Sequence, residues 1–246
     1  MSSSERRPVV IVDDVHVRYK VYATGRRVGR RVGRFERGIK EVHALRGVSF
    51  TVYEGENIGV IGHNGSGKST LLRTVAGFTP ASEGAVYATS QPSLLGVGSA
   101  LLPRLDGHKN INLGALALGM TPAEAEASYD YIAEFSGLKE HLSYPMRTYS
   151  SGMSARLKFS IAMAKAHQIL LVDEALAVGD KAFRDRSEKR IRELREEAGT
   201  TFLVSHSMQS ILDTCDRAIW IDHGELRLDG DPQTVVDAYE ASTADL

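Results

Sequence analysis

The stretch NIGVIGHNGSGKST, residues 57–70, decides the fold of this chain. It opens with a short apolar run, continues with the pattern G-x-x-x-x-G-K-[ST], and leads into a helical pattern over 69–76. Glycines at these positions let backbone N–H groups turn inward around phosphate oxygens, and a helix start adds a positive dipole end. Because average composition produces this pattern by chance in only about 1% of chains of this length, we predict a strand–loop–helix unit that binds nucleotide phosphates.

Each position of this loop has an expected contact. Lys68 is expected to reach the β- and γ-phosphates and to assist catalysis, and the Ser69 hydroxyl to bind Mg²⁺. His63 occupies a variable position of the pattern, so we expect it to contribute through its backbone. The predicted nucleotide-binding residues of the loop are Gly62, His63, Asn64, Gly65, Ser66, Gly67, Lys68, Ser69 and Thr70.

A later apolar run ends in two acids. Ile169–Asp173 is fully apolar until its last residue, as expected for a strand in the middle of a parallel sheet, and Glu174 follows it. Asp173 would then lie at the carboxyl edge of the sheet, where open α/β sheets place their ligands, and would hold Mg²⁺ directly or through water. Glu174 would polarise the attacking water as a catalytic base. Alone, two acids more often mark a solvated strand end, but the phosphate loop earlier in the chain favours the catalytic interpretation.

The rest of the chain alternates strand and helix patterns, which predicts an α/β fold around a parallel sheet. Thr121-Pro122-Ala123-Glu124 combines an N-cap, a Pro at N1 and a Glu at N3, and so predicts a helix that ends near Ser136. We expect one nucleotide-binding domain over 8–230, with a helical subdomain over about 105–165, and a short helical tail over 231–246. The further predicted strands are 9–17, 44–56, 200–205 and 217–222, and the further helices are 152–166, 183–198, 207–215 and 232–240.

Composition agrees with an ordinary folded domain. The chain has 246 residues, 42% of them apolar and 25% charged, with a net charge of −1, which argues against wholesale disorder. No apolar stretch approaches the ~20 residues that span a bilayer, and the start, MSSSERRP, gives no sign of a secretory signal. A single cysteine, Cys215, fits a reducing compartment.

The small net charge hides a strongly basic segment. Residues 18–40 hold nine Lys or Arg and one acid, so they carry +8 and the remainder −9. Apolar residues recur within the segment at helical spacing and arginines line a neighbouring face, which is typical of an interfacial amphipathic helix. Its four glycines oppose helix formation in water. We therefore expect the insert over about 23–41 to contact anionic lipid through Arg26–Lys40, with a solvated flexible loop as the alternative.

Two further motifs complete an order that resembles the nucleotide-binding domain of ABC transporters, from about residue 8 to 230. Tyr149-Ser150-Ser151-Gly152-Met153 opens a predicted helix, and Ser205-His206 follows a predicted buried strand. Alone, the first is usually just an N-cap. In the order phosphate loop, Ser-Ser-Gly, ILLVDE and Ser-His, the resemblance implies a P-loop ATPase of the ABC type with an antiparallel β subdomain. It also implies that 149–153 are a variant signature motif, 177–180 a D-loop, and His206 a catalytic switch histidine that senses the γ-phosphate.

The resemblance further implies the cofactors and the assembly. ATP and Mg²⁺ would be trapped between two copies of the chain arranged head to tail. The γ-phosphate side of each site would come from the signature residues of the other copy, which are Ser150, Ser151, Gly152 and Met153. Closing and opening of this homodimer would drive two copies of a separate membrane permease, so the chain is expected at the cytoplasmic face of the cell membrane.

Four strings narrow the resemblance to exporters of lipid-linked polysaccharides, of the O-antigen, teichoic-acid and galactan type. They are TYSSGM (148–153), DEALAVGD (173–180), SHSM (205–208) and RAIWIDHGEL (217–226). The resemblance implies a lipid-linked glycan as cargo, reached through the permease. Some members carry a C-terminal carbohydrate-binding domain, which we expect this chain to lack because it stops at residue 246.

Three positions depart from the family pattern or leave a choice. Ser151 replaces the first Gly of the signature, and we expect function to survive because Ser150 and Gly152 still offer a hydroxyl and an N–H. The family's Q-loop glutamine has no clear match; Gln91 is a candidate Mg²⁺ contact, against a plain strand-end residue. Tyr19 is the expected adenine-stacking residue, with Tyr22 as its rival and simple packing on the sheet as the alternative.

Two other functions remain as alternatives. The cargo could be a drug or a nutrient. A nucleic-acid-clamping ABC ATPase would use the basic insert for phosphates, but such proteins normally carry long coiled-coil insertions or two nucleotide domains in one chain. This sequence has neither, so we expect no nucleic-acid partner.

Overall fold

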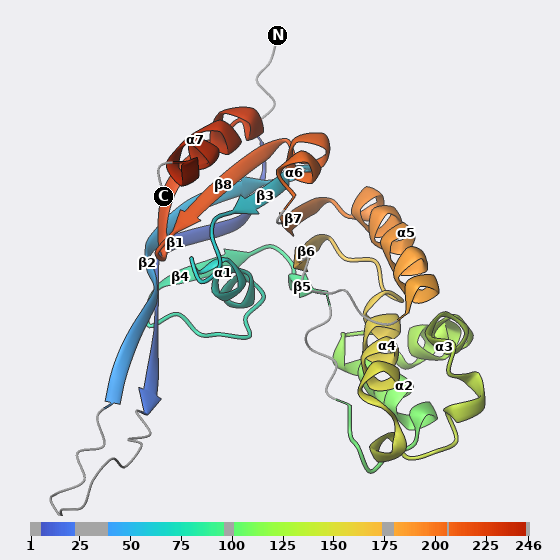
Figure 1. Cartoon of the computed structure of the whole chain (residues 1–246). Helices are drawn as coiled ribbons and strands as arrows, with labels where there is room; N and C mark the ends of the chain where they lie inside the picture. The colour runs from blue at the N-terminus through green and yellow to red at the C-terminus, as the bar shows by residue number, and fades with distance from the viewer. Residues whose placement is uncertain (1–5, 23–38, 96–100, 174–179, 206, 245–246) are drawn as a thin grey trace, which may run out of the picture.

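A computed structural model describes residues 6–22, 39–95, 101–173, 180–205 and 207–244 (Figure 1). Two sheets and three groups of helices make up this part of the chain. The smaller sheet is antiparallel, with the order β2-β1-β4, and consists of β1 (Pro8–Tyr22), β2 (Ile39–Tyr53) and β4 (Glu83–Ala88). This sheet is the antiparallel β subdomain that the sequence predicted.

The first two strands form a long hairpin that projects from the body of the molecule (Figure 1). Both are longer than predicted, because the pairing continues to Tyr22 and Ile39 at the open end. Residues 39–41 therefore belong to β2, which corrects the predicted boundary of the basic insert. It also removes Ile39, the last of the apolar residues at helical spacing, from the predicted amphipathic helix. Residues 23–38 of the insert lie outside the described part of the chain.

The larger sheet has the order β5-β6-β7-β3-β8-β9, and its neighbours are parallel except for the last pair. Apolar strands without alternation, such as the fully buried β7, fit the centre of a sheet that is covered on both faces. The strands are β3 (Asn57–Ile61), β5 (Ser93–Leu94), β6 (Ile169–Asp173), β7 (Thr200–Val204), β8 (Arg217–Asp222) and β9 (Glu225–Gly230).

Two apolar clusters fix the layers of the molecule. One joins the inner face of the small sheet to α1 (Lys68–Val75) and to one face of the large sheet. The other packs helices on the opposite face of the large sheet. The helices that contribute buried residues to this second cluster are α4 (Ser151–Ala162) through Phe159, α5 (Lys181–Glu197), α6 (Met208–Thr214) and α7 (Pro232–Ala244).

A separate helical lobe lies beside the large sheet (Figure 1). It has its own apolar cluster and is linked to the sheets through the chain before α2 and after α4. The predicted capping box is present, since the Thr121 side chain accepts from Glu124 N and the Glu124 carboxylate accepts from Thr121 N. The lobe consists of α2 (Gly107–Ala117), α3 (Pro122–Ser136), α4 (Ser151–Ala162) and two short 3₁₀ turns, Lys139–His141 and Met146–Thr148.

Most predicted elements are confirmed within a few residues, and two differences are informative. The helix predicted over 152–166 ends at Ala162, and Lys165 Nζ instead donates to the carbonyls of Leu118 and Gly119. Strand β9 was missed, because its partly exposed residues carry no strong apolar pattern and its position depends on pairing with β8.

Candidate functional site

The candidate site forms at the carboxyl edge of the large sheet. In the order β6-β7-β3 the strands run parallel, so the loop after β3, Asp173 at the end of β6 and Ser205 after β7 all lie at the same edge. This edge is where open parallel sheets bind ligands. Residues more than a hundred positions apart in the chain are thereby brought together.

The loop 62–67 takes the conformation that its glycines allow. Gly62 has φ +145°, and a Cβ there would lie 2.1 Å from the carbonyl oxygen of Ile221 on β8. Gly67 has φ +115°, and a Cβ there would lie 2.8 Å from the carbonyl oxygen of Ala44 on β2. The loop is thus wedged between both sheets, and only glycine fits at these two places.

Lys68 opens α1 and bends back over the loop. Its Nζ atom donates to the carbonyl oxygens of Gly62 at 2.6 Å and His63 at 2.9 Å. Burial lowers the pKa of this ammonium group, and the nearby Asp173 carboxylate partly opposes that shift. The loop is therefore closed around a positive charge, as a phosphate-binding loop requires.

Ser69 and Asp173 meet at the edge of the sheet. The Ser69 hydroxyl donates to Asp173 Oδ2 at 2.9 Å, and Ser69 is exposed to solvent. A hydroxyl and a carboxylate are hard oxygen donors of the type that Mg²⁺ prefers. The pair fits a magnesium ion that bridges the protein and a nucleotide.

The remaining loop residues have distinct environments. Asn64 and Gly65 are exposed at the tip, and the Ser66 side chain is buried, with no hydrogen-bond partner for its Oγ in the described part of the chain. The Thr70 carbonyl accepts from Thr74 Oγ1 within α1. The orphaned hydroxyl of Ser66 and the outward-facing tip both fit a loop whose full set of contacts includes a ligand.

The signature residues lie in the helical lobe, apart from α1 (Figure 1). Ser150 is the N-cap of α4, and its Oγ accepts from Met153 N at 3.1 Å. Ser150, Ser151 and Gly152 are exposed. One copy of the chain therefore presents this helix start to solvent and does not bring it to its own phosphate loop.

The other predicted contacts are placed as follows. Tyr19 lies on the projecting hairpin opposite Val42, and the residue is 38% exposed, which leaves it accessible for stacking. The side chain of Tyr22, Glu174, residues 177–179 of the D-loop and His206 lie outside the described residues. Asp180, which ends the D-loop string, caps α5 by accepting from Phe183 N.

Gln91 is directed away from Ser69. Its Nε2 atom donates to the Ala76 carbonyl at 2.9 Å, and Ala76 follows the last turn of α1 while Ser69 lies in the first turn. At 1.5 Å rise per residue these two positions are about 10 Å apart. A Mg²⁺ contact for Gln91 stays a prediction that would require this side chain to move.

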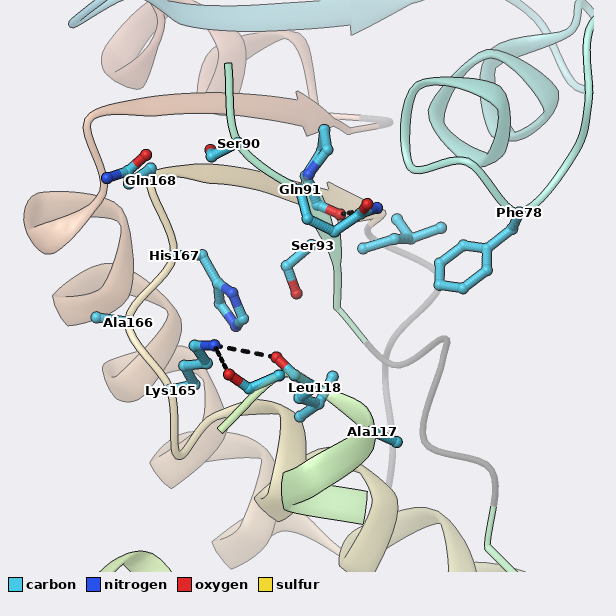
Figure 2. A pocket seen from close by; sticks show the side chains of 13 residues that line it. Phe78, Ser90, Gln91, Ser93, Ala117, Leu118, Lys165, Ala166, His167 and Gln168 are labelled. Atoms are coloured by element: carbon cyan, nitrogen blue, oxygen red, sulfur yellow. Dashed lines mark hydrogen bonds between the residues drawn. The ribbon is translucent and has the colours of Figure 1, made fainter. Parts of the chain in front are cut away.

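Gln91 lines a hollow of about 780 Å³ between the end of α2 and the start of β6 (Figure 2). His167 points into it, and burial lowers the pKa of this imidazole. Lys165 closes one side through its bonds to the end of α2. The hollow lies at the amino ends of β5 and β6, so it is separate from the phosphate loop at the opposite edge.

The sequence reasoning missed one part of the site, the turn between β8 and β9. Gly224 N donates to the Ser66 carbonyl at 2.7 Å, and His63 Nε2 lies 3.0 Å from Asp222 Oδ1. The turn therefore supports the phosphate loop from behind. The local signal was the string DHG (222–224), a turn pattern with glycine, but nothing local tied it to the loop.

Comparison with known proteins gives a consistent picture. Residues 45–177 match the sequence pattern of a protein family described as "ABC transporter". The chain is 41% identical over 209 residues to a "Teichoic acids export ATP-binding protein TagH" of Lactococcus lactis, covering 85% of this chain and 45% of that protein. It is 36% identical over 233 residues to the "ABC transporter protein AbcA" of Aeromonas salmonicida, covering 94% and 76%. The chain spans about half the length of the TagH relatives from Lactococcus lactis and Enterococcus faecalis.

Solved structures agree on the fold. A structure described as the ATP binding subunit of an ABC transporter superposes with a TM-score of 0.68 at 20% identity, covering 94% of this chain and 93% of the other. A dimeric bacterial ABC transporter cassette gives a TM-score of 0.66 at 20% identity, covering 91% and 98%. Within the described residues, none of the helices has the length and apolar character needed to cross a membrane.

Proposed function

The chain belongs to the ABC transporter family, and on that premise we propose that it is an ATP-hydrolysing subunit that powers export of a lipid-linked polysaccharide through a separate permease. The observation that carries the ATPase part is the contact between Ser69 Oγ and Asp173 Oδ2 beside the Lys68 loop. It joins the two motifs that bind Mg²⁺ and phosphate at one edge of the sheet.

In this proposal each of the chain's own site residues has a separate role in ATP binding or hydrolysis. Lys68 leaves one or both loop carbonyls to contact the β- and γ-phosphates, and its charge stabilises the transition state. Ser69 and Asp173 would hold Mg²⁺, which would neutralise phosphate charge. Glu174 orients and deprotonates the attacking water, and His206 contacts the γ-phosphate. Tyr19 stacks on the adenine from the hairpin.

A second copy of the chain completes each site. Ser150, Ser151, Gly152 and Met153 are proposed to contact the γ-phosphate held by the partner. The exposure of this helix start, and its position in a lobe apart from α1, support a role across an interface. The capping bond from Met153 N to Ser150 Oγ would then be exchanged for, or shared with, a phosphate oxygen.

The proposed cargo is inferred from sequence similarity to named relatives. Relatives that are about 40% identical carry the name "Teichoic acids export ATP-binding protein", and we propose a lipid-linked glycan of this general class for the present chain. The permease, in two copies, would hold the chain at the cytoplasmic face of the membrane. Contact of Arg26–Lys40 with anionic lipid is part of the same proposal, supported by the +8 charge of residues 18–40.

A genetic experiment tests the export function. Deleting the gene in the source organism should make the lipid-linked glycan accumulate on the cytoplasmic side, and the wild-type gene should restore export. Lys68→Ala is the matched variant that should be expressed without restoring it. Normal glycan export in the deletion strain would contradict the proposed cargo. A defect in drug resistance or in nutrient uptake in that strain would instead favour the alternative cargoes.

A biochemical experiment tests the membrane contact. The isolated chain should co-sediment with vesicles in proportion to their anionic lipid content. A variant with Arg26, Arg27, Arg30 and Arg31 changed to Gln should bind less, while its ATPase rate stays near the wild-type value. Equal binding of both forms would show that the insert is not a membrane contact.

A further inference from the structure

The turn between β8 and β9 places a second group of polar side chains behind the phosphate loop. His223 has φ +48° and Gly224 has φ +84°, and Asp222 pairs directly with Glu225. These are the features of a two-residue hairpin turn with two left-handed positions. The turn projects the side chains of Asp222 and His223 toward His63, whose ring centroid lies 4.8 Å from that of His223.

His63 is held in the orientation of a ligand. Its Nδ1 atom lies 2.7 Å from the Asn64 carbonyl oxygen, which can only accept, so Nδ1 carries a proton. In the neutral ring Nε2 then has a lone pair and no proton. That Nε2 atom is buried and has no hydrogen-bond partner among the described residues, although the Asp222 carboxylate lies 3.0 Å away. In that tautomer Nε2 is the ring atom available to bind a cation, and the Asp222 carboxylate lies beside it.

The three side chains converge on one point. The His63 and His223 Nε2 atoms lie 3.0 Å and 3.8 Å from Asp222 Oδ1, and one ligand atom from each residue lies within 4.8 Å of the others. Ligands of a tetrahedral zinc ion, each bonded at 2.0–2.1 Å, are about 3.3 Å apart. The two spacings to Asp222 bracket that value, and side-chain adjustment that also sets the two imidazole nitrogens, now within 4.8 Å, at this spacing would close the site.

We propose that His63, Asp222 and His223 form a site for a zinc-class divalent transition-metal ion, with the fourth position open to water. Two imidazoles and one carboxylate suit zinc and exclude a preference for Mg²⁺, which favours all-oxygen sites. The Nδ1 contact of His63 with a carbonyl is the outer bond that orients a metal-ligating histidine. His223 is 70% exposed and Asp222 is 19% exposed, so solvent has a path to the site.

The ion would join the phosphate loop to the hairpin turn. His63 is part of the loop, and its carbonyl accepts from Lys68 Nζ, so metal at this site restrains the backbone that Lys68 contacts. Arg227 opposes binding, because its Nε atom lies 3.3 Å from Asp222 Oδ2. Its side chain is half exposed and can swing toward Glu225, which it already contacts at 3.6 Å.

Titration calorimetry of the full, untagged chain with zinc chloride tests the proposal, without nucleotide or Mg²⁺ and near neutral pH. The wild type should bind one ion per chain, and Mg²⁺ should not compete. His223→Asn should weaken zinc binding at least about tenfold, and asparagine keeps the turn because it tolerates left-handed backbone. Arg227→Gln should tighten binding, a direction that misfolding cannot produce.

His43→Asn is the matched control. His43 belongs to the other close histidine pair, in which His16 Nδ1 lies 3.1 Å from His43 Nε2, and this variant should keep wild-type zinc affinity. Melting temperatures without metal should show that each variant is folded. The proposal is overturned if the wild type takes up no zinc, if His223→Asn binds as tightly as the wild type, or if His43→Asn loses as much affinity as His223→Asn.

Discussion

The hydroxyl of Ser69 donates to Oδ2 of Asp173 at 2.9 Å, across 104 residues of chain. Ser69 lies in the first turn of α1 and Asp173 ends β6, so the contact depends on the parallel arrangement of β3 and β6 on either side of β7. This geometry gives the first prediction. Ser69→Ala should weaken Mg²⁺-dependent ATP binding about 10- to 100-fold, because one hydrogen bond or ligand to charged groups is lost.

Ser69→Thr is the matched control, since threonine keeps the hydroxyl and the loop pattern admits either residue. Isothermal calorimetry with ATP, with and without Mg²⁺, measures both variants. If Ser69→Ala loses the same ATP affinity with and without Mg²⁺, the assigned role is contradicted, because the defect then does not depend on the ion.

The wedged loop gives a prediction about stability. Gly62→Ala should lower the free energy of unfolding by about 3 kcal/mol or more, because its Cβ would lie 2.1 Å from the Ile221 carbonyl oxygen. Gly65→Ala is the control: Gly65 also has positive φ, but a Cβ there lies within 4 Å of no atom of the other described residues. The free energy of unfolding of Gly65→Ala should fall by only ~1–2 kcal/mol, the cost of placing a residue with a Cβ in the left-handed region. Denaturant titrations without nucleotide compare the two, and equal losses would refute the steric explanation.

The proposed catalytic base gives a kinetic prediction. Glu174→Gln should bind MgATP and dimerise, yet turn over about 10²- to 10⁴-fold more slowly, since a positioned base contributes that much. Steady-state phosphate release measures the rate. Lys68→Ala provides the contrast, because it should weaken nucleotide binding itself. A Glu174→Gln variant with normal turnover would exclude this residue as the base.

The exposed start of α4 gives a prediction about assembly. Ser150→Arg should abolish hydrolysis and leave nucleotide binding by the isolated chain nearly unchanged, because Ser150 is proposed to act only on the partner's ATP. Mixed dimers of one Ser150→Arg chain and one Glu174→Gln chain should keep one intact site, since both lesions fall in the other. ATPase rates that scale linearly with chain concentration would instead indicate that each copy hydrolyses alone.

The histidine pair on the hairpin gives a prediction about pH. Burial lowers the pKa of His43 below its ordinary 6.5, as do, to a smaller degree, the charges of Arg18, His16 and Arg46, while Glu41 acts in the opposite direction. The unfolded chain therefore binds a proton at His43 more readily than the folded chain does. Stability from this group is complete above its unfolded pKa of 6.5 and is lost as the pH falls from there through the lower pKa of the folded state.

The melting temperature of the wild type should thus fall on acidification between about pH 7 and pH 5. His43→Asn should make that fall shallower. An unchanged slope in this variant would mean that other groups account for the acid sensitivity.

Much of this protein follows from its sequence through local physics. The glycine spacing over 62–67 specifies a phosphate loop without reference to distant residues, and the capping box at Thr121 and Glu124 fixes where α3 begins. The apolar runs of β3, β6 and β7 likewise indicate buried parallel strands from the local pattern alone. Short-range spacing and side-chain chemistry decide these features, so they can be predicted from the chain alone.

Only the tertiary structure decided which distant residues meet. The strand order places Ser69 against Asp173, and the pairing of β9 with β8 sets the turn that carries Asp222 beside His63. It also turned Gln91 toward Ala76, although the nearness of Gln91 in sequence to the expected Q-loop had made it a candidate magnesium contact. Strand order and register are set by packing of whole apolar faces across the chain, and no local pattern records them.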